Sequence, residues 1–212
     1  MKKLFEKDFT RRNFLKTSAK ILAGTALFGL LPNDADAARR FFTLGDNVFK
    51  TLEEMEIMSY PLDFDEMNYR THTGAIVIHH TGMRFDGDMS VPEIHNMHRY
   101  KNHWAGIGYH FVVHKNGSIE QGRPLEARGA HSLDNNEFTV GICLTGNYNL
   151  GKPPAKQVSS AVQLIGAVCD KYNFEATDTT IFGHRDLSKT TCPGDHLYKL
   201  LPNIIEKVQR LK

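Results

Sequence analysis

Three short apolar runs constrain the fold of this chain more than any other feature of its sequence. The first is Ala-Ile-Val-Ile at residues 75–78, the second covers residues 139–145, and the third covers residues 179–182. Consecutive β-branched residues without polar alternation are typical of a strand that is buried on both faces. The chain is therefore expected to contain a central β-sheet whose strands lie inside the protein.

Helix signals separate these runs. Ser90, followed three residues later by Glu93, is typical of a helix start, and that helix is expected to continue to about residue 100. A second helix is expected over residues 155–172, where apolar side chains recur at helical spacing, and a closing helix over residues 195–211. Strands that alternate with helices indicate an α/β fold.

A hairpin is expected in the middle of the chain. Asn116 and Gly117 lie between two β-rich runs, residues 108–114 and 118–121. Asn-Gly in this position is the strongest short signal for a β-hairpin. The predicted fold class is therefore α/β, a single domain with a central mixed β-sheet and helices packed against it.

The first residues indicate an export signal. Arg11 and Arg12 stand in a Thr-Arg-Arg-Asn-Phe-Leu-Lys segment, which resembles a twin-arginine signal, and an apolar run follows at residues 21–31. Ala35 and Ala37 fit an A-x-A cleavage site. We expect residues 1–37 to be a twin-arginine signal peptide and the protein to be exported to the periplasm or cell envelope by the twin-arginine machinery. An amphipathic surface helix is the alternative for this segment.

Composition excludes several classes of protein. The longest apolar run is shorter than the roughly 18 to 20 residues that a membrane-spanning helix needs. The formal net charge is +2 for the whole chain, and removing residues 1–37 leaves 19 basic and 20 acidic side chains, so neither form suggests binding to nucleic acid. The three cysteines cannot all pair within one chain, so at least one is free, bridged to another chain, or bound to a metal.

Histidines and a cysteine follow the predicted strands. His79 and His80 come at the end of the first strand, and His184 follows the third, eight residues before Cys192. Zinc favours imidazole and thiolate ligands, and a catalytic zinc site keeps three protein ligands and an open fourth position. Because successive strand side chains point to opposite faces, only one of His79 and His80 can face a shared site, and the spacing does not say which.

The motifs occur in an order that resembles a known family, the zinc amidases of the peptidoglycan-recognition and phage-lysozyme type, which are N-acetylmuramoyl-L-alanine amidases. The resemblance covers roughly residues 74–205. It rests on Ile76-Val77-Ile78-His79-His80-Thr81, Ile107-Gly108-Tyr109-His110-Phe111, Asn116-Gly117-Ser118-Ile119-Glu120-Gln121-Gly122-Arg123, Gly129-Ala130-His131, Val140-Gly141-Ile142-Cys143, Gly183-His184-Arg185-Asp186 and Thr191-Cys192-Pro193-Gly194.

The resemblance implies a zinc site and a reaction. The family's metal ligands fall on His79, His184 and Cys192. Its activity is zinc-dependent hydrolysis of the amide between N-acetylmuramic acid and the L-alanine of the stem peptide, so the implied partners are peptidoglycan or muropeptide fragments. Residues 74–212 are then the zinc amidase domain, and residues 38–73 a lead-in segment that packs on it with one short helix.

Three further residues receive roles from the resemblance. The tyrosine of the family's Gly-Tyr-x-Phe strand falls on Tyr109, a candidate donor to the oxyanion of the tetrahedral intermediate. Thr190 is the second expected catalytic residue, where some phage members carry a lysine; here the nearest lysine is Lys189. His131 is expected to lie in the substrate cleft.

Two further histidines and the other two cysteines are expected to be structural. Strand alternation turns His80 and His110 away from the site, and Cys143 and Cys169 lie on apolar elements, which suggests that both belong to the core. Four other histidines could all be surface residues: His98, His103, His114 and His196.

Two other functions stay open at this point. One makes Cys192 a nucleophile activated by His184, since nucleophilic thiolates often lie at a helix N-terminus beside a base. The other is a non-catalytic peptidoglycan-binding module with a structural zinc. A closed structural site needs four protein ligands, whereas the pattern offers three. The presence of Cys192, which non-cutting family members typically lack, favours an enzyme.

Overall fold

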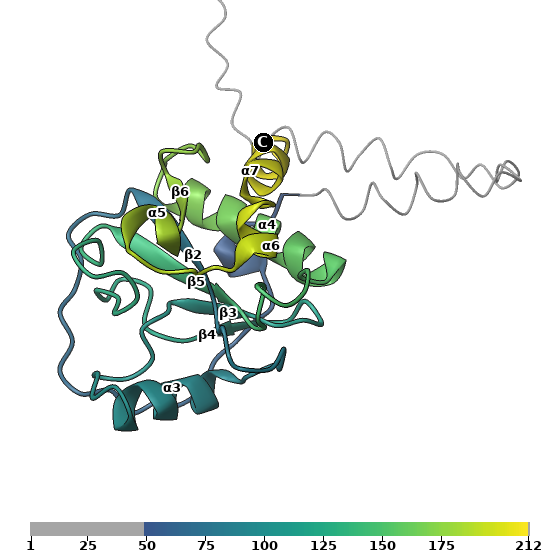
Figure 1. The fold of residues 1–212 in the computed structure, drawn as a ribbon. Coiled ribbons are helices and arrows are strands. Elements are labelled where there is room, and N and C mark those ends of the chain that lie inside the picture. Colours follow the sequence, from purple (N-terminus) through teal and green to yellow (C-terminus); the bar gives the residue numbers. More distant parts are fainter. Residues whose placement is uncertain (1–48, 212) are drawn as a thin grey trace, which may run out of the picture. The chain divides into compact units, whose positions relative to one another are not determined.

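Six strands form one mixed sheet in the order β1-β4-β3-β5-β2-β6 (Figure 1). The computed structural model describes residues 49–211. The strands are β1 (Ile57–Met58), β2 (Ala75–His80), β3 (Phe111–Val113), β4 (Ile119–Gln121), β5 (Thr139–Leu144) and β6 (Ile181–Gly183). The predicted α/β class with a mixed sheet is confirmed, and the expected export signal lies outside the described residues.

Parallel pairing at the centre of the sheet follows from the long connections between these strands. β2 lies between β5 and β6 and is parallel to both. Among the paired strands that the structure describes, only β3 and β4 are antiparallel, and they are joined by the short turn at Asn116 and Gly117. Gly117 has a φ of 91°, a conformation that suits glycine. The predicted hairpin is therefore confirmed, although its first strand begins only at Phe111.

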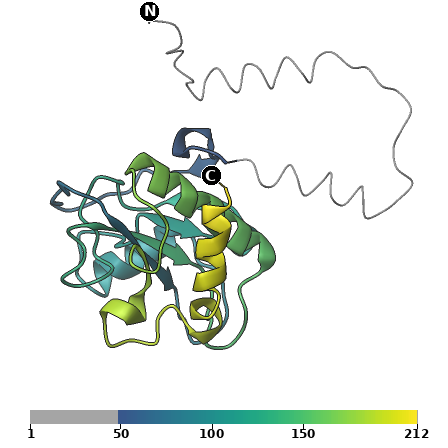
Figure 2. The ribbon, with the colours of Figure 1, turned by 90° about the horizontal axis from the view of Figure 1, so that it is seen from above.

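Helices cover both faces of the sheet. On one face lie α4 (Ala155–Lys171) and α7 (Leu201–Gln209), which Figure 2 shows side by side in front of the strands. On the other face lies α3 (Val91–Tyr100), below the sheet in Figure 1. Glu93 closes the first turn of α3 by accepting hydrogen bonds from the backbone N–H and the hydroxyl of Ser90, both at 2.7 Å. The expected start and end of α3 are thus confirmed.

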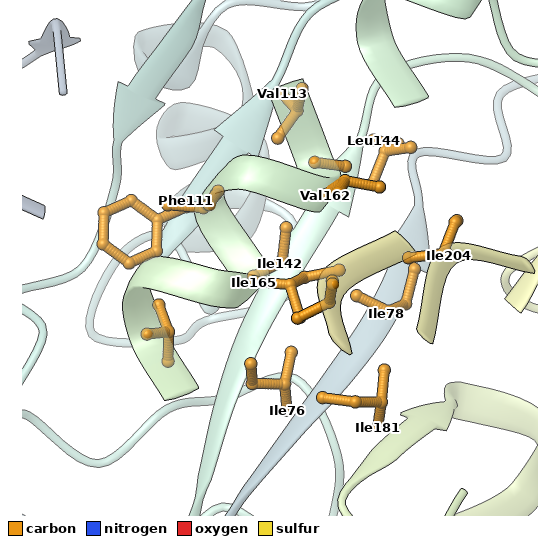
Figure 3. Packing of buried hydrophobic residues seen from close by; sticks show 14 of the residues in the cluster. Ile76, Ile78, Phe111, Val113, Ile142, Leu144, Val162, Ile165, Ile181 and Ile204 are labelled. Carbon is orange, nitrogen blue, oxygen red and sulfur yellow. The ribbon is translucent and has the colours of Figure 1, made fainter. Parts of the chain in front are cut away.

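The larger core lies between the sheet and the pair α4 and α7. Alternate residues of β2 and β5 point into it, and Figure 3 shows them packed under the two helices. Its labelled members are all buried: Ile76, Ile78, Phe111, Val113, Ile142, Leu144, Val162, Ile165, Ile181 and Ile204.

A smaller apolar cluster lies under α3. Val91 and Ile94 of α3 pack on Ile107, Val112 and Cys143, all of them fully buried. This cluster is much smaller than the first because the same face of β2 and β5 also carries polar side chains and a glycine. The result is a sheet with one aliphatic face and one mixed face.

Two elements differ from the sequence prediction. The expected closing helix over residues 195–211 is two helices, α6 (Asp195–Tyr198) and α7, because the chain turns at Lys199 and Leu200 before Pro202 opens the second. The third strand is Ile181–Gly183, since residues 177–180 form a turn. A four-residue helix, α5 (His184–Leu187), follows that strand directly.

The lead-in contributes more than the expected short helix. A 3-10 turn, η1 (Leu52–Glu54), is followed by β1, which pairs in parallel with β4 at the edge of the sheet. Tyr60 then donates a hydrogen bond of 2.8 Å to the buried carboxylate of Glu120. Described residues of the lead-in are therefore part of the same sheet, while the domain boundary at residue 74 stays a prediction.

Across residues 49–211, no helix has both the length and the apolar character that crossing a membrane requires.

Candidate metal centre

The two histidine-bearing strands bring their ends together. β2 and β6 are parallel neighbours, with Ile78 opposite Gly183, so His79 and His184 emerge side by side at the carboxyl end of the sheet. Their ring centroids are 4.6 Å apart. Carboxyl ends of parallel strands are where α/β sheets display functional side chains, and here the topology places two imidazoles at that edge.

Cys192 completes the group from the loop between α5 and α6. The backbone N–H of Arg185 donates to the carbonyl of Cys192 at 2.9 Å, which holds the loop against α5. The Cys192 sulfur lies 3.7 Å from Nδ1 of His79. One ligand atom from each of His79, His184 and Cys192 falls within 4.8 Å of the others, as a shared metal ion requires.

Strand alternation decides between the two adjacent histidines. His79 points to the mixed face, toward His184 and Cys192. His80 points to the aliphatic face, where its Nδ1 accepts a hydrogen bond of 3.1 Å from the backbone N–H of Tyr148. Burial, with a smaller effect of the Arg185 charge, lowers the pKa of His80 to about 4. His79 is therefore the member of the pair that lies in the cluster, as the resemblance implies.

The donor set suits a zinc ion. Two imidazoles and one thiol are the ligand types that zinc prefers, and three protein ligands leave a fourth position open. Burial, with the neighbouring imidazoles acting in the same direction, lowers the pKa of His79 well below its usual value, which keeps the ring in the neutral form that binds metal. His184 is half-buried, and burial lowers its pKa too.

The raised pKa of the Cys192 thiol does not support a free thiolate nucleophile. Burial raises the pKa of the Cys192 thiol to about 11, against the smaller opposing effects of the His80 backbone N–H and the Arg185 charge. Nucleophilic cysteines carry a depressed pKa instead. A bound cation reverses this balance because a coordinating thiol is deprotonated outright.

Tyr109 forms a wall of the same site. Its ring centroid lies 5.1 Å from that of His79 and 5.3 Å from that of His98. Burial, reinforced by the neighbouring Cys143 and Cys192, raises the pKa of Tyr109 well above 10. The phenol therefore keeps its proton at neutral pH and can act as a hydrogen-bond donor.

Thr190 lies in the loop that carries Cys192. Its side chain is exposed, and its hydroxyl oxygen accepts a hydrogen bond of 3.2 Å from the backbone N–H of Cys192. Lys189 is exposed beside it. The observed contact of Thr190 is thus with the backbone of the ligand residue, and a direct part in the reaction stays a prediction.

His131 lies under His79. Its Nδ1 is 3.0 Å from Nε2 of His79, and the two rings meet edge to face. Burial lowers the pKa of His131 to about 3. Only 6% of His131 is exposed, and its expected place in the substrate cleft stays a prediction.

Two of the histidines that could have been surface residues, His98 and His114, are buried. His98 accepts a hydrogen bond of 3.0 Å from the backbone N–H of Gly108, and burial lowers its pKa to about 4. His114 is buried between two carboxylates, those of Asp88 at 2.8 Å and Glu120 at 3.1 Å. The sequence left the placement of His98 open, and the packing of α3 shows that this side chain faces inward.

The structural placement of the other expected core residues agrees with the sequence. His110 is buried, and its Nδ1 accepts a hydrogen bond of 2.9 Å from the backbone N–H of Gly141. Cys143 and Cys169 are fully buried and are not in a disulfide. Gly141 is a residue that sequence reasoning passed over, although an isolated glycine inside a strand often marks the close approach of another group.

Comparison with known proteins gives a family match and related sequences. A family model described as N-acetylmuramoyl-L-alanine amidase matches residues 69–195. The peptidoglycan-recognition protein SC1a of Drosophila melanogaster is 30% identical over 127 residues, which is 58% of this chain and 68% of that protein. The endolysin of Klebsiella phage KP32 is 29% identical over 126 residues, which is 59% of this chain and 83% of the endolysin.

Solved structures agree with the fold as well. The N-acetylmuramoyl-L-alanine amidase LysC from Clostridium intestinale URNW superposes with a TM-score of 0.65 at 31% identity, over 73% of this chain and 98% of that one. Drosophila PGRP-LB superposes with a TM-score of 0.61 at 24% identity, over 68% of this chain and 91% of that one. The second likeness bears on the fold alone.

Proposed function

Because the chain belongs to the N-acetylmuramoyl-L-alanine amidase family, we propose that it is a zinc-dependent hydrolase of the amide between N-acetylmuramic acid and L-alanine in peptidoglycan. The observation that carries the proposal is the convergence of His79, His184 and Cys192, whose ligand atoms lie within 4.8 Å of one another. The sequence identity to a phage endolysin and to the Clostridium amidase supports the proposal that the chain is an enzyme.

Three ligands and an open position favour catalysis over a purely structural metal. Among the residues that the structure describes, the cluster holds three metal-binding side chains, whereas closed structural zinc sites hold four. When bound, zinc would polarise the scissile carbonyl and lower the pKa of a coordinated water to about 7. His79, His184 and Cys192 would hold it in place.

Tyr109 is the proposed donor to the developing oxyanion. Its phenol keeps its proton because burial raises its pKa well above 10, and its ring lies beside the ligand His79. A preorganised donor of this kind acts at the point where negative charge develops on the carbonyl oxygen. The proposed part of Thr190 is to shape the ligand loop through its hydrogen bond to the backbone of Cys192.

The proposed substrate and compartment rest on the relatives and on the first residues of the chain. Relatives named as endolysin and as peptidoglycan-recognition protein support peptidoglycan or its muropeptide fragments as the partner. Arg11 and Arg12, with the apolar run at residues 21–31, support export by the twin-arginine route to the periplasm or cell envelope. The lead-in at residues 38–73 and the amidase domain at residues 74–212 would then make up the exported protein.

The proposal is tested with purified peptidoglycan fragments and mass spectrometry. The chain is expected to release stem peptides that begin with L-alanine, and to lose this activity on treatment with a zinc chelator. Cys192→Ser is expected to reduce the rate about 10³-fold or more, since metal catalysis supplies several kcal/mol. Thr191→Ala, an exposed neighbour in the same loop, is the matched control and should stay active.

Other outcomes discriminate the competing functions. Release that survives chelation but not Cys192→Ser would point to a cysteine nucleophile and contradict the proposal. Binding to the fragments without any release would point to a recognition module.

A further inference from the structure

A second imidazole lies directly against the proposed ligand His79. Nδ1 of His131 is 3.0 Å from Nε2 of His79, while Nδ1 of His79 lies 3.7 Å from the Cys192 sulfur. The two nitrogens of His79 thus face two different partners. We propose that His131 is a positioning residue, whose Nδ1 accepts the Nε2 proton of His79 and so presents Nδ1 of His79 to the metal; this inference rests on the proposed zinc site.

The proton arrangement follows from the requirements of metal binding. A neutral imidazole carries one proton, and the nitrogen that binds a metal must be the one without it. With Nδ1 of His79 facing Cys192, the proton belongs on Nε2, whose hydrogen-bonding partner among the described residues is Nδ1 of His131. The proton of His131 is then on its own Nε2, a buried atom that has no hydrogen-bond partner among the described residues.

Two glycines make room for the His131 ring. A Cβ atom added to Gly141 in β5 would lie 2.5 Å from ring atoms of His131, and one added to Gly129 would lie 2.4 Å from its Cδ2. Both distances are far shorter than a carbon–carbon contact allows. Every other amino acid at these two positions would push the ring away from His79, so the slot exists only because both side chains are missing.

The backbone of His131 is held as firmly as its ring. Oδ1 of Asn136 accepts hydrogen bonds from the backbone N–H of His131 at 2.9 Å and of Ser132 at 3.0 Å. Asn136 is itself buried. With its backbone fixed and its ring confined by Gly129 and Gly141, His131 has little freedom to turn away from His79.

Burial separates this role from substrate binding. Only 6% of His131 is exposed, so the ring has little surface to offer a peptide or a sugar. Metal-ligating histidines usually donate their second N–H to an acceptor, and loss of that acceptor typically weakens metal affinity 10- to 100-fold. In this chain a histidine, rather than the more common carboxylate or carbonyl, would fill that place.

The test measures zinc affinity directly, by competition with a chromophoric chelator on the purified chain. His131→Asn puts an acceptor oxygen at the place of Nδ1, whereas His131→Gln puts its amide at the place of Nε2. We expect His131→Asn to stay within a few-fold of the unmodified chain and His131→Gln and His131→Ala to bind zinc 10- to 100-fold more weakly. His103→Ala, at an exposed histidine, should leave the affinity unchanged.

The Asn and Gln pair keeps the test decisive even if His131→Ala does not fold, because both amides fill much of the slot. Equal affinity in His131→Gln and the unmodified chain would overturn the inference, as would an equal loss in the Asn and Gln variants, which would indicate a role in loop packing alone. A chain that binds zinc with the expected order of variants but releases no stem peptide would contradict the proposed function and leave the inference standing.

Discussion

The two faces of one sheet differ sharply, although they are made by the same strands. In β2, Ile76 and Ile78 enter the aliphatic core under α4 and α7, while His79 points the other way to the metal centre. In β5, Ile142 enters that core while Gly141 makes room for His131. The alternation of a strand therefore assigns stability to one face and chemistry to the other, residue by residue.

The difference also appears in how each face is held together. The core on the aliphatic face consists mainly of apolar side chains, with Ile165 and Ile204 contributed by the helices. On the mixed face, buried histidines accept hydrogen bonds from backbone N–H groups, as His98 does from Gly108 and His110 from Gly141. Such bonds offset the cost of burying polar groups and fix the irregular backbone beside the site.

The largest expected effect is on the aliphatic face. Ile142→Ala removes a fully buried side chain from the centre of that core, and we expect the free energy of unfolding to fall by about 2–5 kcal/mol. Chemical denaturation measures this loss. Leu133→Ala, at a leucine that is 76% exposed, is the control and should change stability by about 0.5 kcal/mol or less. If folded Ile142→Ala also lost zinc affinity, the division of labour between the faces would be wrong.

On the mixed face, the corresponding change should affect the reaction instead. Tyr109→Phe removes the phenol proton donor beside His79, and we expect kcat to fall about 10²- to 10³-fold with little change in KM or in stability. Steady-state kinetics on muropeptide fragments measures it, with Tyr100→Phe at an exposed tyrosine as the control. An unchanged kcat would remove Tyr109 from the proposed mechanism.

A smaller effect concerns the pH dependence of stability and involves His98 on the mixed face. Burial lowers the pKa of His98 to about 4, whereas an unfolded histidine titrates near 6.5. Between these values the unfolded chain binds the additional proton, so the free energy of unfolding falls as the pH is lowered from 6.5 to 4, by up to about 3 kcal/mol from this residue.

His98→Asn tests this prediction because it keeps an acceptor for the Gly108 N–H but does not titrate. Denaturation curves at several pH values should show a shallower loss of stability in the variant than in the unmodified chain over that range. Parallel pH profiles for the two proteins would mean that His98 is not held neutral by its burial.

Short-range sequence patterns predicted much of the fold. The run that becomes β2, the Ser90 and Glu93 pair that starts α3, and the Asn-Gly turn before β4 each depend on neighbouring residues, so they could be predicted before any packing was known. The edge strand β1 could not, because a two-residue strand has no pattern of its own and forms only where the free edge of β4 accepts it. The break between α6 and α7 is of the same kind, since it depends on how the chain turns back over the sheet.

For the candidate site, the motifs named the residues but left their geometry open. Spacing could not choose between His79 and His80, and it could not place Cys192, which is more than a hundred residues away in the sequence. The parallel register of β2 and β6 brings His184 beside His79, and the loop after α5 brings in the sulfur. The contact between His131 and His79 joins two residues 52 positions apart, so no local pattern contains it.

The sequence alone determined which residues were available for chemistry and which runs had to be buried, because apolar patterning and turn residues act over a few neighbours. The order of the motifs along the sequence also predicted membership of the amidase family, which the family match confirms. The tertiary structure alone decided which nitrogen of His79 faces Cys192, which histidines are buried, and which glycines leave space for a ring. These properties depend on strand register and on helix packing, which join distant residues and are set only when the whole sheet has formed.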